Sequence, residues 1–464
     1  MLRLVDMYIK MVSGQMNEMN VKTIKSLCGI LAMLAFTACS SNKDESADAP
    51  RFYNVTLTAS MGDGETRALS EGAGNVITAT FAENDEVVVV KANGTSVGTL
   101  TAKTAGASTT LSGPLNAASL TVGEEVKLRY RSATANYDGQ IGTLAGIAAG
   151  QDYAEGTLTV STTSPLAFTS NSVTLSAMQS ITKFTFKDAS TDAAVSVKTF
   201  GIAAVGLVQN IAANGTPTIG AVTGTLSTAA SDVYIALRNN TDAKQTYAFT
   251  IQDNAGNWYI FTKQAKLTNG NNYALSIALT PLPTLTSSSA VGTIGVVDGL
   301  PAIVVEINST KVGVALMNTG ALCPEAYGTY YIFSQKASGL SDGWYVPTKD
   351  ELYVKENDVV TGGLAKISNA WTTQNGVNGR LFTISEGKTF FLPAAGFIDN
   401  DNDEGQETAY TGKVLVSTFG YYWSQTEATP SSMAYSLQFS SANINVFSEY
   451  EVNALPVRPF HALN

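Results

Sequence analysis

The chain has 464 residues, of which 44% are apolar and 14% charged, and its formal net charge is −10. This length predicts two to four domains, because a single hydrophobic core rarely serves so long a chain. The net charge argues against nucleic acid and anionic lipid as partners, since binding to them requires clustered lysine and arginine. The low charged fraction is usual for extracellular β-proteins rich in threonine, serine and glycine.

Two residue types that carry much enzyme chemistry are nearly missing. His461 is the one histidine, and the three cysteines are Cys28, Cys39 and Cys323. Histidine is the usual general base and a usual ligand of zinc, so triads and zinc sites built on it are disfavoured. We therefore expect no enzymatic activity, no catalytic residues and no cofactor-binding residues, and we expect Cys323 to be a buried apolar residue.

Residues 1–38 are interpreted as an export signal. Lys22 and Lys25 precede an apolar run, 27–36, that is too short to span a bilayer. Cys39 stands where cleavage is expected, and the segment resembles a bacterial lipoprotein signal. The resemblance implies a mature N-terminus at Cys39 that carries acyl chains, so palmitate or a similar lipid anchors the protein. The alternative is an ordinary cleaved signal with a chance cysteine.

Residues 39–50 are expected to form a flexible tether. SSNKDES, at 40–46, resembles the signal that sends lipoproteins of Bacteroides-type bacteria to the cell surface. The expected location is therefore the exposed face of the outer membrane, held by a lipid anchor.

Residues 51–340 alternate apolar and polar side chains in the period of two that indicates half-buried strands. The stretch 86–102 predicts a hairpin with a type I′ turn at Asn93-Gly94. The stretch 125–131 predicts a strand with Val126, Leu128 and Tyr130 on its buried face, and 246–265 predicts a second hairpin. Turn signals every 8–12 residues favour β-sandwiches.

The pattern divides this region in two, at 51–165 and 166–282, followed by a serine/threonine linker at 283–290. Within it, several motifs resemble the fimbrillin-like (Mfa-like) family of Bacteroides and its relatives, in order and spacing. They are ETRALS (65–70), TATFAENDEVVVV (78–90), YDGQIGTL (137–144) and LTNGNNYALSIAL (267–279).

The resemblance implies two tandem transthyretin-like β-sandwiches in a subunit of surface fimbriae. It also implies proteolytic processing between Arg67 and Ala68, which removes the first strand, YNVTLTAS at 53–60. A neighbouring fimbrial subunit would then add a strand to the opened groove by β-strand addition. The alternative for Arg67 is a plain surface arginine in a glycine-rich loop. The strand to be lost places Val55, Leu57 and Ala59 on one face.

Residues 291–464 carry a different set of motifs. Thr348 and Glu351 have the spacing of a capping box and predict a helix start. The whole set resembles bacterial paralogous domains with a C-type-lectin-like fold, which implies an α+β domain. The motifs are DGWYVPTKDELYV (342–354), KTFFLPAAGF (388–397), FGYYWSQTE (419–427), AYSLQF (434–439) and PVRPF (456–460).

Metal ligands are expected only in the acidic stretch 398–407. Asp399, Asp401 and Asp403 alternate there, and hard oxygen ligands at this spacing suit Ca²⁺. The alternative is a solvated acidic loop.

These inferences predict a mostly β surface protein of the fimbrial tip or adhesin type. Its partners would be other fimbrial subunits and a host or bacterial glycan or protein, and it would move from the outer membrane to the fimbrium after processing. One alternative is a lipid-anchored glycan-binding lipoprotein that never polymerises. Another is a hydrolase with a carboxylate pair that no motif marks.

Overall fold

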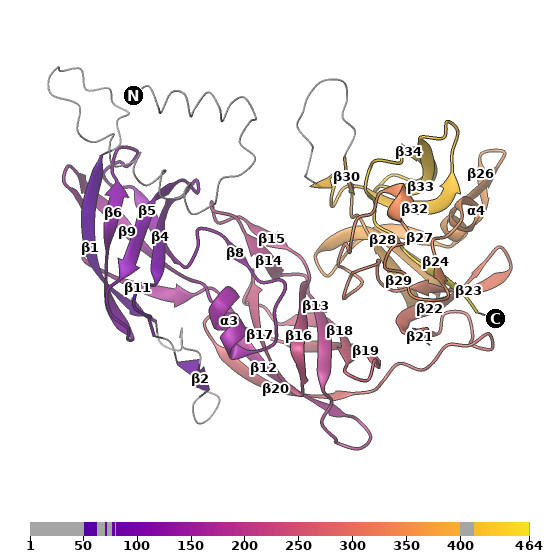
Figure 1. Cartoon of the computed structure of the whole chain (residues 1–464), viewed down its shortest axis with the longest axis horizontal. Helices are drawn as coiled ribbons and strands as arrows, with labels where there is room; N and C mark the ends of the chain where they lie inside the picture. Colours follow the sequence, from indigo (N-terminus) through magenta and orange to yellow (C-terminus); the bar gives the residue numbers. More distant parts are fainter. Residues whose placement is uncertain (1–50, 63–69, 72–76, 79, 400–412, 464) are drawn as a thin grey trace, which may run out of the picture. The chain divides into compact units, whose positions relative to one another are not determined.

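The computed structural model describes residues 51–62, 70–71, 77–78, 80–399 and 413–463 (Figure 1). These residues belong to one compact unit, Pro50–Asn464. The described chain is mostly β, as the sequence predicts, and its few helices are short.

The first eight-stranded sheet has the order β10-β9-β11-β1-β6-β5-β4-β7, and β7 also pairs with β9. This last pairing closes a ring of seven strands, so β1 has a hydrogen-bonded neighbour on each side. The strands are β1 (Phe52–Met61), β4 (Glu86–Lys91), β5 (Ser96–Ala102), β6 (Ser108–Asn116), β7 (Glu125–Tyr130), β9 (Ala154–Thr163), β10 (Leu166–Phe168) and β11 (Ser172–Ala177).

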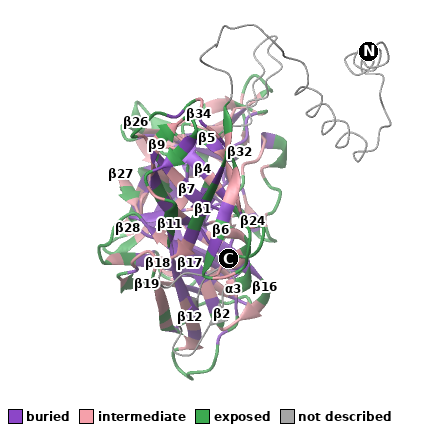
Figure 2. Ribbon diagram, turned by 90° about the vertical axis from the view of Figure 1, so that its left-hand side faces the viewer, coloured by how far each residue is buried: buried purple, intermediate pink, exposed green. Residues whose placement is uncertain are grey.

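Alternate side chains of these strands form one hydrophobic cluster inside the ring. Figure 2 shows the buried positions in purple along the strands. Val126, Leu128 and Tyr130 are buried in β7, as predicted. A separate two-stranded pair joins β2 (Ser70–Glu71) to β3 (Ile77–Thr78).

The sheet does not end at the break expected between residues 165 and 166. The strands β10 and β11 lie beyond that point, and both pair with β9 of the first sheet. Conversely, Tyr137 and Ile147 precede the break but pack in the next hydrophobic cluster. Each core therefore includes a segment from the other side of the predicted boundary. A boundary predicted from the order of segments along the chain cannot show this.

The second sandwich consists of two sheets that enclose this second hydrophobic cluster. One sheet has the order β15-β14-β17-β12-β20, with β8 beside β14, and the other has the order β16-β13-β18-β19. The elements are β8 (Ala135–Asn136), α3 (Leu144–Gly150), β12 (Ser180–Asp188), β13 (Val197–Ala203), β14 (Leu207–Ile211), β15 (Pro217–Ile219), β16 (Val222–Ala230), β17 (Asp232–Asn239), β18 (Gln245–Asp253), β19 (Trp258–Ala265) and β20 (Asn272–Leu279).

Both predicted hairpins are present, as β4–β5 and β18–β19. The turn of the first hairpin differs from the prediction. A type I′ turn requires positive φ at both central residues, but of Asn93 and Gly94 only Gly94 has it, at +87°.

The C-terminal region contains five small sheets: β21-β22-β23-β35-β24, β25-β26, β27-β28-β29, β30-β31 and β32-β33-β34. The elements are β21 (Ile294–Val297), β22 (Leu300–Ile307), β23 (Thr310–Ala315), η1 (Phe333–Gln335), β24 (Trp344–Tyr345), α4 (Lys349–Leu352), β25 (Val354–Glu356), β26 (Val359–Gly362), η2 (Leu364–Lys366), β27 (Asn369–Gln374), β28 (Val377–Ser385), β29 (Lys388–Pro393), β30 (Phe397–Ile398), β31 (Lys413–Val414), β32 (Gly420–Glu427), β33 (Met433–Phe439), β34 (Ile444–Tyr450) and β35 (Phe460–Ala462).

Helix α4 begins with the predicted capping box. The Thr348 hydroxyl accepts from the Glu351 amide at 3.1 Å, and the Glu351 carboxylate accepts from the Thr348 amide at 2.8 Å. Arg458, 2% exposed, donates to the carbonyls of Ala315 and Phe391 at 2.9 and 3.1 Å. It therefore links β23 to β29 through the core, and burial lowers its pKa to about 10.

The stretch expected to be a linker is packed instead. Leu285 is buried in a cluster with Val297 and Trp344, and its amide donates to the Val296 carbonyl at 2.7 Å. The Trp258 indole in β19 also donates to the Gly299 carbonyl at 2.8 Å. The second sandwich and the C-terminal region are therefore joined by direct contacts as well as by the chain.

Candidate assembly site at the first strand

Strand β1 is enclosed by two strands of opposite direction. It pairs antiparallel with β6 along its whole length, from Phe52 opposite Asn116 to Ser60 opposite Ser108. It pairs parallel with β11 over Thr58–Met61. The last residues of β1 thus have a neighbouring strand on both sides, and the earlier residues pair with β6.

The side chains of β1 alternate as the sequence predicts. Val55, Leu57 and Ala59 are 7%, 3% and 0% exposed, and they point into the first core. Thr56 and Thr58 are exposed. Burying a valine or leucine side chain stabilises a fold by about 1.5–3 kcal/mol. Strand β1 is the first strand of the sheet in the sequence, and its buried side chains therefore contribute several kcal/mol to the stability of this core.

Strand β11 depends on β1 for most of its pairing. It meets β9 at only two positions, Ser176 opposite Glu155 and Ala177 opposite Ala154. Its preceding residues, Ser172–Leu175, pair with β1. Loss of β1 would therefore leave backbone groups of both β6 and β11 without partners, and such groups are costly when buried.

The second sandwich repeats this arrangement. Strand β12 pairs antiparallel with β17 and parallel with β20, as β1 does with β6 and β11. In the second sandwich the enclosed strand lies in mid-chain. In the first it is followed immediately by residues 63–69, which include Arg67.

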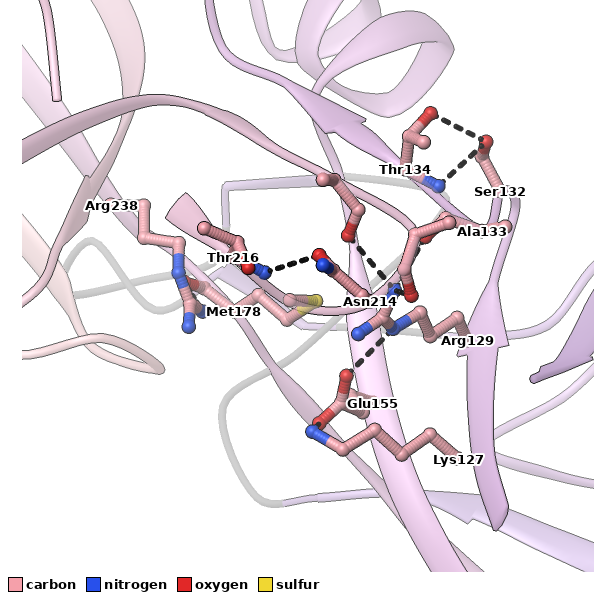
Figure 3. Close-up of polar contacts among 12 residues, drawn as sticks. Lys127, Arg129, Ser132, Ala133, Thr134, Glu155, Met178, Asn214, Thr216 and Arg238 are labelled. Atoms are coloured by element: carbon pink, nitrogen blue, oxygen red, sulfur yellow. Dashed lines mark hydrogen bonds and ion pairs between the residues drawn. The ribbon is translucent and has the colours of Figure 1, made fainter. Parts of the chain in front are cut away.

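A partly buried ion-pair network supports the strand next to β11. The Glu155 carboxylate in β9 accepts from Arg129 Nε at 2.8 Å and from Lys127 Nζ at 2.7 Å, both in β7 (Figure 3). The Arg129 side chain is 3% exposed, whereas that of Lys127 is 39% exposed. Burial by itself raises the pKa of Glu155, but the hydrogen bonds and charges of Lys127 and Arg129 outweigh it, so the pKa is lowered from 4.5.

The same arginine reaches the second sandwich. Arg129 Nη1 donates to the carbonyls of Ala133 and Ala213, at 2.5 and 2.7 Å (Figure 3). The hairpin tip at Gly94 approaches the same turn so closely that an added Cβ would lie 2.6 Å from the Asn214 nitrogen. The network thus couples β9, and through it β11, to the β14–β15 turn.

The structure describes only one of the site residues predicted from the sequence. Asp399 follows β30, is half-buried and has an interaction partner. Cys39, Arg67, Ala68, Asp401 and Asp403 lie outside the described residues. Their roles, and that of Asp399 in binding Ca²⁺, therefore stay predictions.

Arg129 is the member of this region that sequence reasoning missed. It alternates with Lys127 and Arg131 along the strand, so the sequence pattern predicts that it lies on the solvent-exposed face. Its burial depends on Ala133 and on the turn at Ala213, more than 80 residues later. No local signal in the sequence marks that contact.

The residue types most associated with catalysis are engaged elsewhere. Cys323 is buried, as predicted, and burial together with Glu325 raises its pKa, which disfavours a reactive thiolate. His461 Nε2 lies 2.7 Å from Asp298 Oδ2, and its ring packs against Trp344. Within the described part of the chain, no group of three or more histidine, cysteine, aspartate and glutamate side chains could hold a metal ion.

Comparisons with known proteins give a family model and distant structural neighbours. A model described as "Domain of unknown function (DUF8237)" matches residues 353–460. No curated protein matches the chain. No helix among the described residues has the length and apolar character needed to cross a membrane.

Three solved structures illustrate what the chain is similar to. A candidate cell adhesion protein from Bacteroides uniformis is 12% identical, with a TM-score of 0.30 over 49% of this chain and 95% of that one. A fimbrial assembly protein from Parabacteroides distasonis is 11% identical, with a TM-score of 0.26 over 57% and 95%. The tip fimbrial protein Mfa3 from Porphyromonas gingivalis, with a C-terminal truncation, is 9% identical, with a TM-score of 0.26 over 50% and 96%. At these values the function must be inferred from the chain itself.

Proposed function

We propose that this chain is a surface fimbrial subunit of the tip or adhesin type, which exchanges β1 for a strand of a neighbouring subunit. The observation that carries the proposal is the enclosure of β1 between β6 and β11, with Arg67 a few residues after its end. Removing β1 would open a slot lined by apolar side chains and by unpaired backbone groups, and an added strand would satisfy both.

The place of the subunit in the fibre follows from what comes after β20. A shaft subunit must free a strand to donate to the next copy. Here the chain that leaves β20 is bound, because the Leu282 amide donates to the Trp258 carbonyl at 2.8 Å and Leu285 is buried. This supports a subunit that accepts a strand and ends the fibre, with residues 291–464 as a C-type-lectin-like domain that presents a binding surface.

Anchoring completes the proposal. The precursor is held at the outer membrane by acyl chains on Cys39, and cleavage after Arg67 releases the folded part together with its open slot. The proposed rival is a lipoprotein that keeps its anchor and β1 and binds glycans without polymerising.

Intact-mass measurement of protein from sheared fibres and from membranes separates the two. We expect a chain that begins at Ala68 in the fibres, and an Arg67→Ala variant that stays in the membrane with acylated Cys39. Arg51→Ala is the matched control, because Arg51 precedes β1 and cleavage there would leave β1 in place; processing should be unchanged. Wild-type protein found only as an acylated chain starting at Cys39 would support the rival.

A further inference from the structure

A cavity of about 440 Å³ lies where the second sandwich meets the C-terminal region. Its walls come from the β8 segment and β14–β16 on one side and from residues 320–328 and 413–417 on the other. Small-molecule sites usually have volumes of roughly 300–1,000 Å³, so this cavity has room for a ligand of one or two rings.

The walls of the cavity are in firm contact below it. Cys323 packs with Ala203 and Ala221 in a small buried cluster. At Gly201 an added Cβ would lie 2.6 Å from the backbone carbonyl oxygen of Leu322. The two regions therefore meet backbone to backbone, and this contact fixes the shape of the cavity.

A carboxylate from the second sandwich is held in place at the cavity. Asp138 Oδ1 accepts from the Thr223 amide at 2.8 Å and from the Thr223 hydroxyl at 2.6 Å. Gln209 Nε2 donates to Asp138 Oδ2 at 3.3 Å. Asp138 is thus preorganised, and among the described residues its second oxygen accepts one long hydrogen bond.

A second carboxylate lines the cavity from the C-terminal region. Glu325 is 4% exposed, and its Oε1 accepts from Gln374 Nε2 at 3.0 Å and Asn375 Nδ2 at 2.7 Å. Its Oε2 accepts no hydrogen bond from the described residues. Oε2 is not among the fully buried polar atoms that lack a partner, so it is open to the cavity that Glu325 lines and can accept a hydrogen bond from a ligand.

The one ammonium group at the cavity lies on an aromatic surface. Lys413 Nζ is 4.8 Å from the centre of the Tyr330 ring and 5.8 Å from that of Tyr327. No carboxylate of the described residues lies within ion-pair distance of it. Burial lowers the pKa of Lys413, and Asp138 partly opposes this. Lys413 therefore has donor capacity left for a ligand.

These groups determine the chemistry of the ligand. Two carboxylates and one ammonium leave the cavity with a net negative charge, which disfavours an anion. Acceptors on Asp138 and Glu325 and the donor on Lys413 suit neighbouring hydroxyl groups, each of which donates and accepts. We propose that this cavity binds a neutral, hydroxyl-rich sugar residue of a glycan through protein groups alone. The proposal rests on the adhesive role inferred above and names its ligand class and site.

The test is binding of the full mature chain to an array of neutral and acidic oligosaccharides, with and without EDTA, followed by calorimetric titration of the strongest neutral oligosaccharide. Glu325→Gln keeps an oxygen for Gln374 and Asn375 but replaces Oε2 with an amide nitrogen. Lys413→Gln removes the ammonium at the rim. Each should weaken binding by about tenfold or more, as expected when a charged hydrogen-bond partner is lost.

Exposed residues supply the matched controls. Glu386→Gln and Lys263→Gln repeat the same chemical changes away from the cavity and should leave affinity unchanged. Thermal unfolding of each variant shows whether it is folded. Lys413 is exposed, so Lys413→Gln should fold normally and tests the site even if Glu325→Gln does not fold. We expect binding of neutral glycans that persists in EDTA.

Three results would overturn the inference: retention of acidic glycans alone, loss of binding in EDTA, or cavity variants that bind like the controls. Each leaves the fimbrial role intact if the chain is still found in fibres starting at Ala68. The reverse outcome, cavity-dependent glycan binding by a chain that never enters fibres, would remove the fimbrial role and keep the site.

Discussion

Replacing Leu57 with alanine should lower the free energy of opening of the first sheet by about 2–5 kcal/mol, the usual range for a buried leucine. Leu57 is at the centre of β1 and 3% exposed. Its side chain packs inside the closed ring, where surrounding strands are paired and cannot collapse into the space. The effect should appear as faster hydrogen exchange in β1, β6 and β11, measured by mass spectrometry.

Thr58→Ala is the control for this prediction. Thr58 is the next residue of the same strand and is exposed, so its loss should change stability by no more than about 0.5 kcal/mol. Exchange in β20 and β12 should not respond to either variant. Equal effects of the two substitutions would show that the inward face of β1 does not hold the sheet together.

Replacing Arg129 with methionine should destabilise the contact between the first sheet and the β14–β15 turn by about 3 kcal/mol, because it leaves polar groups buried without their partner. The carbonyls of Ala133 and Ala213 lose their donor, and Glu155 keeps only Lys127. Lys127→Met removes the other partner of the same carboxylate. That pair is partly exposed, so the cost should be at most about 1 kcal/mol.

The same network predicts a dependence on pH. The pKa of Glu155 is lower in the folded protein than its ordinary value of 4.5, so its charged form stabilises the fold. This contribution is complete above the unfolded pKa and is lost as the pH falls below 4.5 and through the folded pKa. Urea unfolding between pH 7 and pH 3 should therefore show a smaller loss of stability in Arg129→Met than in the wild type. Parallel curves would contradict the assignment.

Local features of the fold could be predicted from the sequence because they depend on neighbouring residues. The alternation of Val55, Leu57 and Ala59 and the capping box at Thr348 and Glu351 need no information from elsewhere in the chain. The hairpin at Gly94 could also be located. Its turn type could not, because the Gly94 amide donates to the Lys91 carbonyl, which places Ala92 and Asn93 at the centre of the turn instead of Asn93 and Gly94.

Features that depend on distant pairing could not be predicted. Strand β7 closes the first sheet by pairing with β9, and β11 pairs with β1. The alternation of apolar and polar residues in these strands would be the same if they had other neighbours, so it does not reveal which strands pair. The packing of Leu285 contradicts a linker composition because one apolar residue among serines and threonines is enough to anchor the segment.

The candidate sites divide in the same way. The slot of β1 could be proposed from the alternating strand and the arginine that follows it. The cavity could not, because Asp138, Glu325 and Lys413 are spread over 275 residues and none stands in a recognisable motif. Only the contact between the second sandwich and the C-terminal region brings them together.

The most direct test of strand exchange uses the chain cleaved after Arg67 and freed of β1. A fluorescent peptide of residues 51–62 should bind it with one-to-one saturation and restore slow hydrogen exchange in β6 and β11. The same peptide with Leu57→Asp should not bind, because a carboxylate cannot enter the apolar slot. If the cleaved chain already protects β6 and β11 and binds neither peptide, β1 is not an exchangeable strand and the proposed assembly is wrong.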